Sequence, residues 1–385
     1  MIDRIIDFSI RRRWFIVVAA GLLAVWGARS ALRTPVDAIP DLSENQVVVF
    51  TEWPGHGPLE IEDQITYPLS LEFKGLNGVR VVRSSSDVGF SMVSVIFEDR
   101  VGWNEGRKQV EEALARSSNR WPAGAVPRRT PDAAATGQIF WYTVEGGGFD
   151  PGRLRAIQDW YVRPRLASVD GVAEVASVGG FCLEYRVELD PHRLRAHKVS
   201  AGAVAEALRK SNAAVGGDVV HKGNAEYVAS GVGWLGARAG HAEQPSDPQR
   251  IIRDLENVTV VNTDGTAIPL SSLGSAGLGS AARRGILEKD GGEATGGVVL
   301  MKHGENPLRV TRRLREKIQE IQPGLPAGVR IVAVYDRTPL IEGTISTVTD
   351  TLLEAILTAT ICILIVLRHA RTAFLVAITL PLAVL

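Results

Sequence analysis

Two acidic residues lie four positions apart inside a long apolar stretch near the end of the chain. Asp350 and Glu354 are the only charged residues in 348–367. A spacing of four places both carboxylates on one face of a helix. Charge inside a membrane span is costly and usually marks a function, such as carrying protons or ions. Both residues lie near one end of the stretch, so an interfacial or packing role is the alternative.

Histidine and methionine are the residues that would bind a borderline or soft metal ion. No two of the seven histidines have the close spacing of a zinc site. His192 and His197 come nearest to it, and ordinary exposed histidines are the alternative. Methionine thioethers suit Cu(I), but we expect Met92 and Met301 to fill gaps in a strand core. The metal ligands are therefore unknown from this part of the chain.

Three polar residues near predicted strand ends could line a substrate cleft. They are Gln138, Glu174 and Glu98. Solvated strand edges are the alternative, because charged side chains are mostly exposed. The sequence contains no nucleophile triad or paired catalytic carboxylates, and the glycines at 146–148 lack the GxGxxG spacing of a dinucleotide site. We therefore expect no enzyme activity and no cofactor.

The net charge excludes a further class of function. The 43 basic and 43 acidic residues cancel, so the chain has no electrostatic footprint for nucleic acid. Its 45% hydrophobic and 22% charged residues are typical of a globular body with a few membrane spans.

Three apolar stretches could lie in a lipid bilayer, which a helix crosses in about 20 residues. They are 14–28, 348–367 and the beginning of a third at 372–385. A cleaved signal peptide is the alternative for the first stretch. Trp26 and Arg29 near the would-be cleavage site count against it.

Basic residues predict the orientation of these helices, since they flank membrane spans on the cytoplasmic side. Arg4 and the arginines at 11–13 place the N-terminus inside, and Arg368, His369 and Arg371 place the loop after the second span inside. Two crossings then leave the large middle region outside the cytoplasm.

The first part of that middle region has the pattern of a split β-α-β sandwich. The predicted order is strand 45–53, helix 58–73, strands 79–84 and 90–97, helix 104–116 and a closing strand at 126–130.

The same order then begins again and is interrupted, which predicts a repeat of fold within the chain. The second unit has strand 138–144, helix 151–167, strand 172–178, strands 285–289 and 297–302, helix 307–321 and strand 329–335.

The interruption has its own elements. We predict strand 184–189, a helix capped by Ser200 through Leu208, an extended arm at 216–227, a glycine-marked loop at 231–247, and strand 256–262 followed by a hairpin turn. The arm either docks on a neighbouring protomer or forms a mobile surface loop.

Taken together, these segments resemble the heavy-metal efflux branch of the resistance–nodulation–division permeases. The resemblance covers essentially the whole chain. The motifs that carry it are PVDAIPDLS at 35–43, WPG at 53–55, QITYPL at 64–69, VIFED at 95–99, LRAIQDW at 154–160, VAEVASVGG at 172–180, DPHRL at 190–194, GGVV at 296–299 and YDR at 335–337.

The resemblance implies an α+β membrane protein with two ferredoxin-like split β-α-β porter subdomains and an inserted docking subdomain, flanked by transmembrane helices. The implied domains are 1–33 with the first membrane helix, 34–133 as first porter subdomain, 134–180 and 283–337 as second, 181–282 as docking subdomain, 338–367 with the second membrane helix, and 368–385 with the start of a third.

The function implied by this resemblance is proton-driven export of heavy-metal cations from the periplasm, with the metal as substrate. The family works in the bacterial inner membrane as a homotrimer with a periplasmic adaptor and an outer-membrane channel. Divalent-metal relatives tend to carry an acidic residue where this chain has Gln138, which slightly favours copper or silver over zinc, cobalt or cadmium.

The family's permeases are more than twice as long as this chain, and their proton-carrying residues and second porter pair lie in the remainder. We therefore expect a fragment of a longer protein or a truncated product. The alternative function is a transport-incompetent, membrane-anchored periplasmic interaction module.

Overall fold

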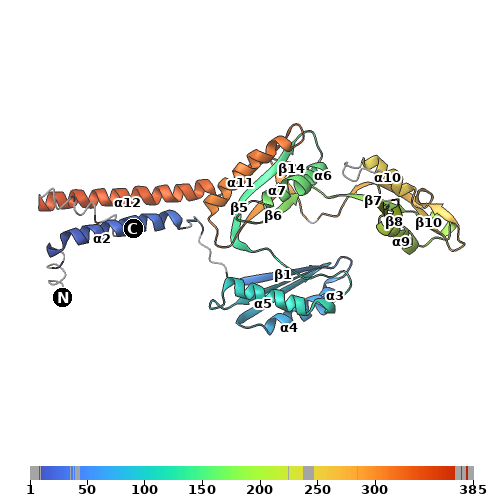
Figure 1. Ribbon diagram of the computed structural model, residues 1–385, viewed down its shortest axis with the longest axis horizontal. Helices are drawn as coiled ribbons and strands as arrows, with labels where there is room; N and C mark the ends of the chain where they lie inside the picture. Colours follow the sequence, from blue (N-terminus) through green and yellow to red (C-terminus); the bar gives the residue numbers. More distant parts are fainter. Residues whose placement is uncertain are drawn as a thin grey trace. The chain divides into compact units, whose positions relative to one another are not determined.

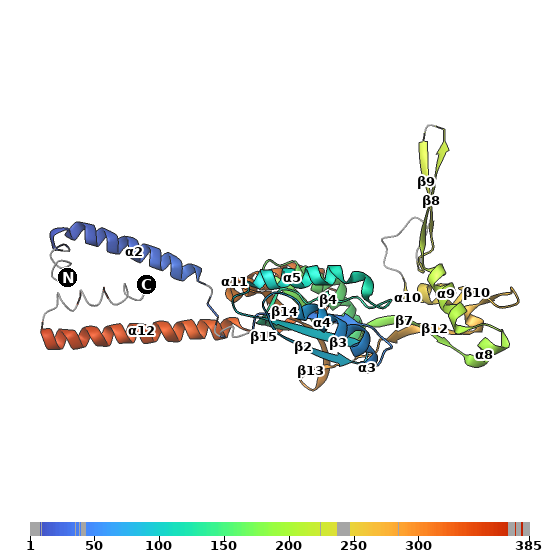
Figure 2. The ribbon, with the colours of Figure 1, turned by 90° about the horizontal axis from the view of Figure 1, so that it is seen from below.

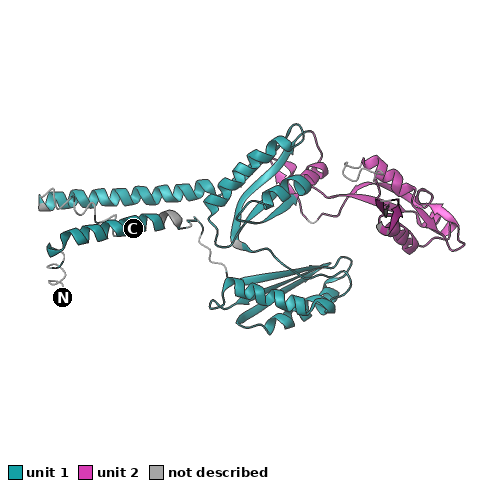
Figure 3. Ribbon diagram, in the orientation of Figure 1, with its two compact units in different colours: residues 1–147, 158–178, 296–385 teal, residues 148–157, 179–295 magenta. Residues whose placement is uncertain are grey.

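The computed structural model describes residues 8, 10–34, 36, 37, 39, 44–223, 225–236, 247–283, 285–368, 374 and 379. The chain divides into two compact units (Figure 3). Unit 1 comprises 1–147, 158–178 and 296–385, and unit 2 comprises 148–157 and 179–295. Unit 2 contains the predicted docking subdomain, and the predicted subdomain boundaries stay a prediction.

Two helices of unit 1 are long and apolar enough to cross a membrane. Helix α2 (Arg13–Arg33) contains a candidate span over Arg13–Ser30, and α12 (Thr338–Leu367) contains one over Thr338–Val366. Their windows are 6% and 0% buried within the chain, as expected for surfaces that face lipid. The predicted apolar stretches at 14–28 and 348–367 are thus helical, and α12 begins earlier than the stretch itself.

The two predicted porter subdomains are called the first and the second porter module. The first is a four-stranded antiparallel sheet with helices on one face (Figure 1). Its strand order is β2-β3-β1-β4, formed by Val79–Asp87, Phe90–Phe97, Gln46–Glu52 and Arg128–Arg129. Helix α5 (Trp103–Arg116) and the helical stretch from Pro58 to Lys74 cover it. The predicted β-α-β-β-α-β order is therefore confirmed.

The core of this module follows from helical spacing. Ile61, Ile65, Leu69 and Phe73 recur every four residues, so they share one face, and all four are 0% exposed. They pack against the inward side chains of the sheet, such as Val49.

Each porter module contains a helix with a π-helical interruption. In the first module α3 (Pro58–Ile61) passes through a π segment (Glu62–Thr66) into α4 (Tyr67–Lys74). In the second, α6 (Pro151–Ile157) passes through Gln158–Val162 into α7 (Arg163–Ala167). Pro68 and Pro164 follow the π segments, and proline cannot donate the usual helical hydrogen bond. The two predicted helices have the expected extent but are not regular.

The second porter sheet has five strands, in the order β13-β14-β5-β15 with β6 paired to β14. They are Leu287–Lys289, Gly292–Lys302, Ala133–Gly146, Val329–Asp336 and Val172–Gly179. Helix α11 (Pro307–Ile321) buries Val310 and Leu314. The repeat of fold is confirmed, with β5 longer than the predicted 138–144.

Unit 2 contains three antiparallel ribbons and short helices. Strand β7 (Leu183–Leu189) pairs with β12 (Gly274–Ser280), β10 (Thr259–Val261) with β11 (Ala267–Pro269), and β8 (Ala214–Lys222) with β9 (Ala225–Val232). The β8–β9 hairpin extends away from the helices of its unit (Figure 2). Ser200 caps α9 (Ala201–Ser211) by accepting from the Ala203 amide, as predicted.

Two predictions in this unit need correction, and one helix was missed. Glu256 belongs to α10 (Pro248–Glu256), so the predicted strand 256–262 shrinks to β10. Gly231 lies in β9 rather than in a loop, because it pairs with Val215 of β8. Helix α8 (Pro191–Ala196) was not predicted, since its six residues are too few to show a period. The described residues do not include Arg4, His369, Arg371, most of 35–43, 237–246 and most of 369–385.

Candidate functional site

The three predicted cleft residues lie on or next to three different strands. Gln138 is exposed on β5, and Glu174 is partly buried on β6, with β14 between these strands. Glu98 follows β3 in the other sheet and forms an ion pair with Arg100. The fold does not gather them into one cluster, and their contact with substrate stays a prediction.

Within the described part of the chain, no three His, Cys, Asp or Glu side chains are close enough together to hold a metal ion. His192 and His197 lie at opposite ends of α8, which separates the nearest candidate pair. His56 stacks on Trp53 at 3.4 Å between ring centres and places its Nδ1 2.9 Å from Glu60. These contacts are ordinary packing for histidines on a surface.

The two acids of the candidate membrane span lie four positions apart on α12. Asp350 and Glu354 are both exposed within the chain. The Ser346 hydroxyl donates to Asp350 Oδ2 at 3.2 Å. A role in moving protons or ions stays a prediction.

A buried polar cluster, which sequence reasoning missed, joins the π segment of the second module to its sheet. The Gln158 side-chain nitrogen donates to the Tyr142 hydroxyl oxygen at 2.9 Å. The Tyr142 hydroxyl donates to the Gln158 side-chain oxygen at 3.1 Å. Gln158 also donates to Ser177, which in turn donates to Asp159. Burial raises the pKa of Tyr142 well above its usual range. The cluster anchors β5, the strand that carries Gln138.

A second missed contact joins the two porter modules. The centre of the Trp103 ring lies 4.0 Å from the centre of the His303 ring and 3.5 Å from the Arg107 guanidinium carbon. Two groups so close to one ring must occupy opposite faces. Arg107 is 6% exposed and donates to Asp132 at 2.7 Å. The i,i+4 spacing of Trp103 and Arg107 could have predicted their stacking, but nothing in the sequence pointed to His303.

The YDR motif at 335–337 joins the end of β15 to the beginning of α12, which contains the second candidate membrane span. The Asp336 Oδ1 atom accepts from the amide of Thr338, the first residue of α12, at 2.8 Å. Its Oδ2 accepts from Arg315 Nε at 2.9 Å. The next residue, Arg337, is 4% exposed. The motif was recognised in the sequence, but its structural role required the fold.

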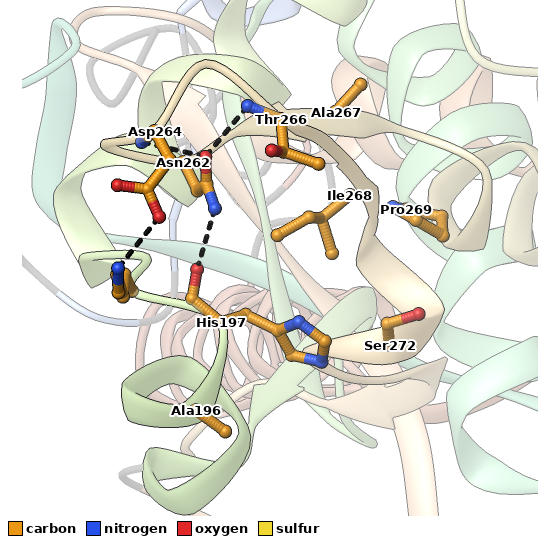
Figure 4. Close-up of a pocket in the computed structure, with 10 residues that line it drawn as sticks. Ala196, His197, Asn262, Asp264, Thr266, Ala267, Ile268, Pro269 and Ser272 are labelled. Carbon is orange, nitrogen blue, oxygen red and sulfur yellow. Dashed lines mark hydrogen bonds and ion pairs between the residues drawn. The ribbon is translucent and has the colours of Figure 1, made fainter.

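Unit 2 contains a cavity of about 350 Å³ (Figure 4). Lys198 Nζ lies 2.9 Å from Asp264 across its rim, and Asn262 donates to the His197 carbonyl at 3.2 Å. The two opposite charges pair with each other, so this pair presents no net charge to an ion. The cavity wall is formed by Ala196, His197, Lys198, Asn262, Asp264, Thr266, Ala267, Ile268, Pro269 and Ser272.

Comparison with known proteins supplies the wider context. The sequence profile of the AcrB/AcrD/AcrF family matches residues 5–385. The chain is 35% identical over 386 residues to the cation efflux system protein CusA of Escherichia coli K12, covering 99% of this chain and 36% of CusA. It is 34% identical to the cobalt-zinc-cadmium resistance protein CzcA of Cupriavidus metallidurans, covering 100% of this chain and 36% of CzcA.

A crystal structure of a heavy metal efflux pump superposes with a TM-score of 0.85 at 29% identity, covering 98% of this chain and 37% of that pump. The chain thus spans little more than a third of the relatives it matches. The resemblance expected from the motifs is confirmed over the whole chain. The chain belongs to the AcrB/AcrD/AcrF family, and the relatives to which it is similar are heavy-metal efflux pumps.

Proposed function

We propose that the chain is the N-terminal part of a proton-driven inner-membrane permease that exports heavy-metal cations from the periplasm. The observation that carries the proposal is the arrangement of two split β-α-β modules between two candidate membrane helices, an arrangement similar to that of a heavy metal efflux pump. In this proposal the protein is a transporter and not an enzyme. The metal ion is its substrate, and no resident cofactor takes part.

Copper or silver is the favoured cargo. Gln138 is exposed on β5 and offers a neutral amide, which lacks the charge that a hard divalent ion prefers. Glu174 and Glu98 remain candidates for a cleft wall. The acidic pair on α12 is a candidate for an ion or proton role at the membrane surface.

The proposed assembly is a homotrimer with a periplasmic adaptor and an outer-membrane channel. The β8–β9 hairpin supports it, because Val219, Val220 and Tyr227 are 40%, 54% and 57% exposed along the arm. An apolar ribbon that stands away from its own unit is stabilised when it packs on a neighbour. A closed threefold ring is the symmetry expected for such head-to-tail contacts.

The first experiment compares metal resistance with and without the intact gene. A deletion strain and its complemented form are grown in graded copper, silver, zinc, cobalt and cadmium salts, and retained metal is measured in the cells. We expect the deletion strain to be sensitised to copper or silver and to retain more of that metal. Unchanged sensitivity to all five metals would refute the transport proposal.

A substitution at Gln138 tests the cargo preference. Gln138→Glu introduces a carboxylate in a side chain of nearly the same size. This variant is expected to raise zinc or cobalt resistance relative to copper resistance. Gln138→Leu is the matched control, since it removes the polar group without adding charge. If both variants keep the wild-type order of metals, this position does not select the cargo.

The rival function is an interaction module without transport. Immunoblotting of native membranes with an antibody to the porter region measures the mass of the mature protein. A single species near 41.5 kDa, the mass of this chain, would favour the module. A much larger species would favour the pump.

A further inference from the structure

Resting on the proposed transport function, we propose that Arg337 is a positioning residue that couples both membrane helices to the strand between the two porter modules. It is a single buried guanidinium that reaches three separate parts of unit 1. No metal or proton contact is part of its role.

The contacts of Arg337 are directional and short. Its Nη1 donates to Asp37 Oδ2 at 2.8 Å. Its Nη2 donates to the Thr136 carbonyl at 2.6 Å and to the Gln138 carbonyl at 3.2 Å. The backbone amide of Arg337 donates to the Ile139 carbonyl at 3.2 Å. The side chain and the backbone therefore both attach to the beginning of β5.

The three partners lie where the modules and the membrane helices join. Asp37 follows α2 by a few residues, and Arg337 itself immediately precedes α12. Thr136 and Gln138 lie in β5 after the chain leaves the first module's last strand, β4. One side chain thus connects the end of one candidate membrane helix, the beginning of the other and the strand that leads from one module to the next.

The chemistry of this site requires arginine. A guanidinium is planar and has several donors in a fixed fork, whereas lysine has one compact ammonium group. Arg337 is 4% exposed, while its partner Asp37 is 24% exposed at the side chain. Its Nε atom has no hydrogen-bond partner among the described residues. A buried ion pair that serves only stability can often be replaced by apolar packing. We therefore interpret a buried arginine whose Nε atom has no acceptor in the described part of the chain as a positioning residue.

The mechanical consequence follows from the acceptors. A shift of α2 moves Asp37, and a shift of α12 moves Arg337. Either shift changes the force that the Arg337 guanidinium exerts on the Gln138 carbonyl. Since β5 also pairs with β15 from Phe140 onward, the displacement is passed to the second porter sheet. Movement of the membrane helices is thereby converted into movement of the predicted cleft wall.

The test uses Arg337→Lys and Asp37→Asn in the intact protein, with Arg315→Lys as the matched control. Arg315 pairs with Asp336, the neighbouring residue, but its side chain is about half exposed. Metal export from whole cells is measured over a range of metal concentrations, normalised to the amount of inserted protein. We expect the maximal rate to fall about tenfold or more in both variants, with the half-saturating concentration within about twofold of wild type. The control is expected to keep the wild-type rate.

A second measurement does not depend on transport. With the native cysteines replaced by serine, nitroxide labels at Glu342 on α12 and Glu112 on α5 report the distance between helix and module, and labels at Arg83 and Glu112 report the first module alone. Arg337→Lys is expected to broaden the first distance distribution and leave the second unchanged. Wild-type rates and distances in both variants, or broadening of both distributions, would overturn the proposal. A wild-type protein that exports no metal would refute the transport function, while the label distances would still test Arg337.

Discussion

Replacing Gly297 with alanine tests how tightly the buried polar cluster of the second module is built. A Cβ atom at this position would lie 2.5 Å from Tyr142 Oη, 2.7 Å from its Cζ and 2.9 Å from Gln158 Nε2. Real Cβ atoms do not approach other atoms so closely, so either the ring or the amide must move. Gly297 belongs to the GGVV motif, and this contact explains its lack of a side chain.

The expected cost follows from burial. Tyr142 is 1% exposed and Gln158 is 0% exposed, so neither can swing into solvent. Overpacking a rigid core costs about 1–3 kcal/mol. Separating the Tyr142 hydroxyl from the Gln158 amide adds about 1 kcal/mol. Even the lower end of this sum, about 2 kcal/mol, raises the open population of β5 by roughly 30-fold.

Hydrogen exchange read by mass spectrometry on the intact protein measures this effect at the β5 amides. Gly277→Ala is the matched control, because this strand glycine has no atom within 4 Å of the added Cβ. We expect the control to stay within about 0.5 kcal/mol of wild type. If Gly297→Ala exchanges as slowly as the control, the cluster is not packed as described and the reasoning fails.

Three further predictions concern caps and charges. Ser200→Ala removes the acceptor for the Ala203 amide and is expected to destabilise α9 by about 1 kcal/mol. The loss is measured as faster hydrogen exchange of the first turn of α9, and unchanged exchange would contradict the cap. Asp132→Ala leaves the Arg107 charge buried without its Asp132 partner, so this variant should lower the melting temperature more than Arg107→Met does. The reverse order of melting temperatures would refute the prediction. Hydrogen bonds from the His192 and Arg193 amides lower the pKa of Asp190 in the folded protein. The ionised carboxylate therefore stabilises α8 at pH values above the pKa of Asp190 in the unfolded chain. This stabilisation is lost as the pH falls through the pKa of the folded protein. Asp190→Asn is expected to abolish this pH dependence of α8 protection, and a dependence that survives in the variant would assign it to another group.

The order of elements was predictable because it depends on local pattern. The apolar spacing of Ile61, Ile65, Leu69 and Phe73 defines a helix face without any knowledge of the partner sheet. The repeated β-α-β-β-α-β order followed in the same way, as did the Ser200 cap. The π segments were not predicted, because the spacing of apolar residues hardly changes when one turn widens by a single residue.

The contacts that couple distant parts were decided by tertiary structure alone. Arg337 and Asp37 are 300 positions apart in the chain, and no local pattern relates them. The stacking of His303 on Trp103 likewise depends on how two modules meet. Sequence determined which residues are apolar, which are charged and the order in which most elements follow one another. Only the fold decided which buried charges find a partner, because long-range pairing depends on chain segments that sequence spacing does not connect.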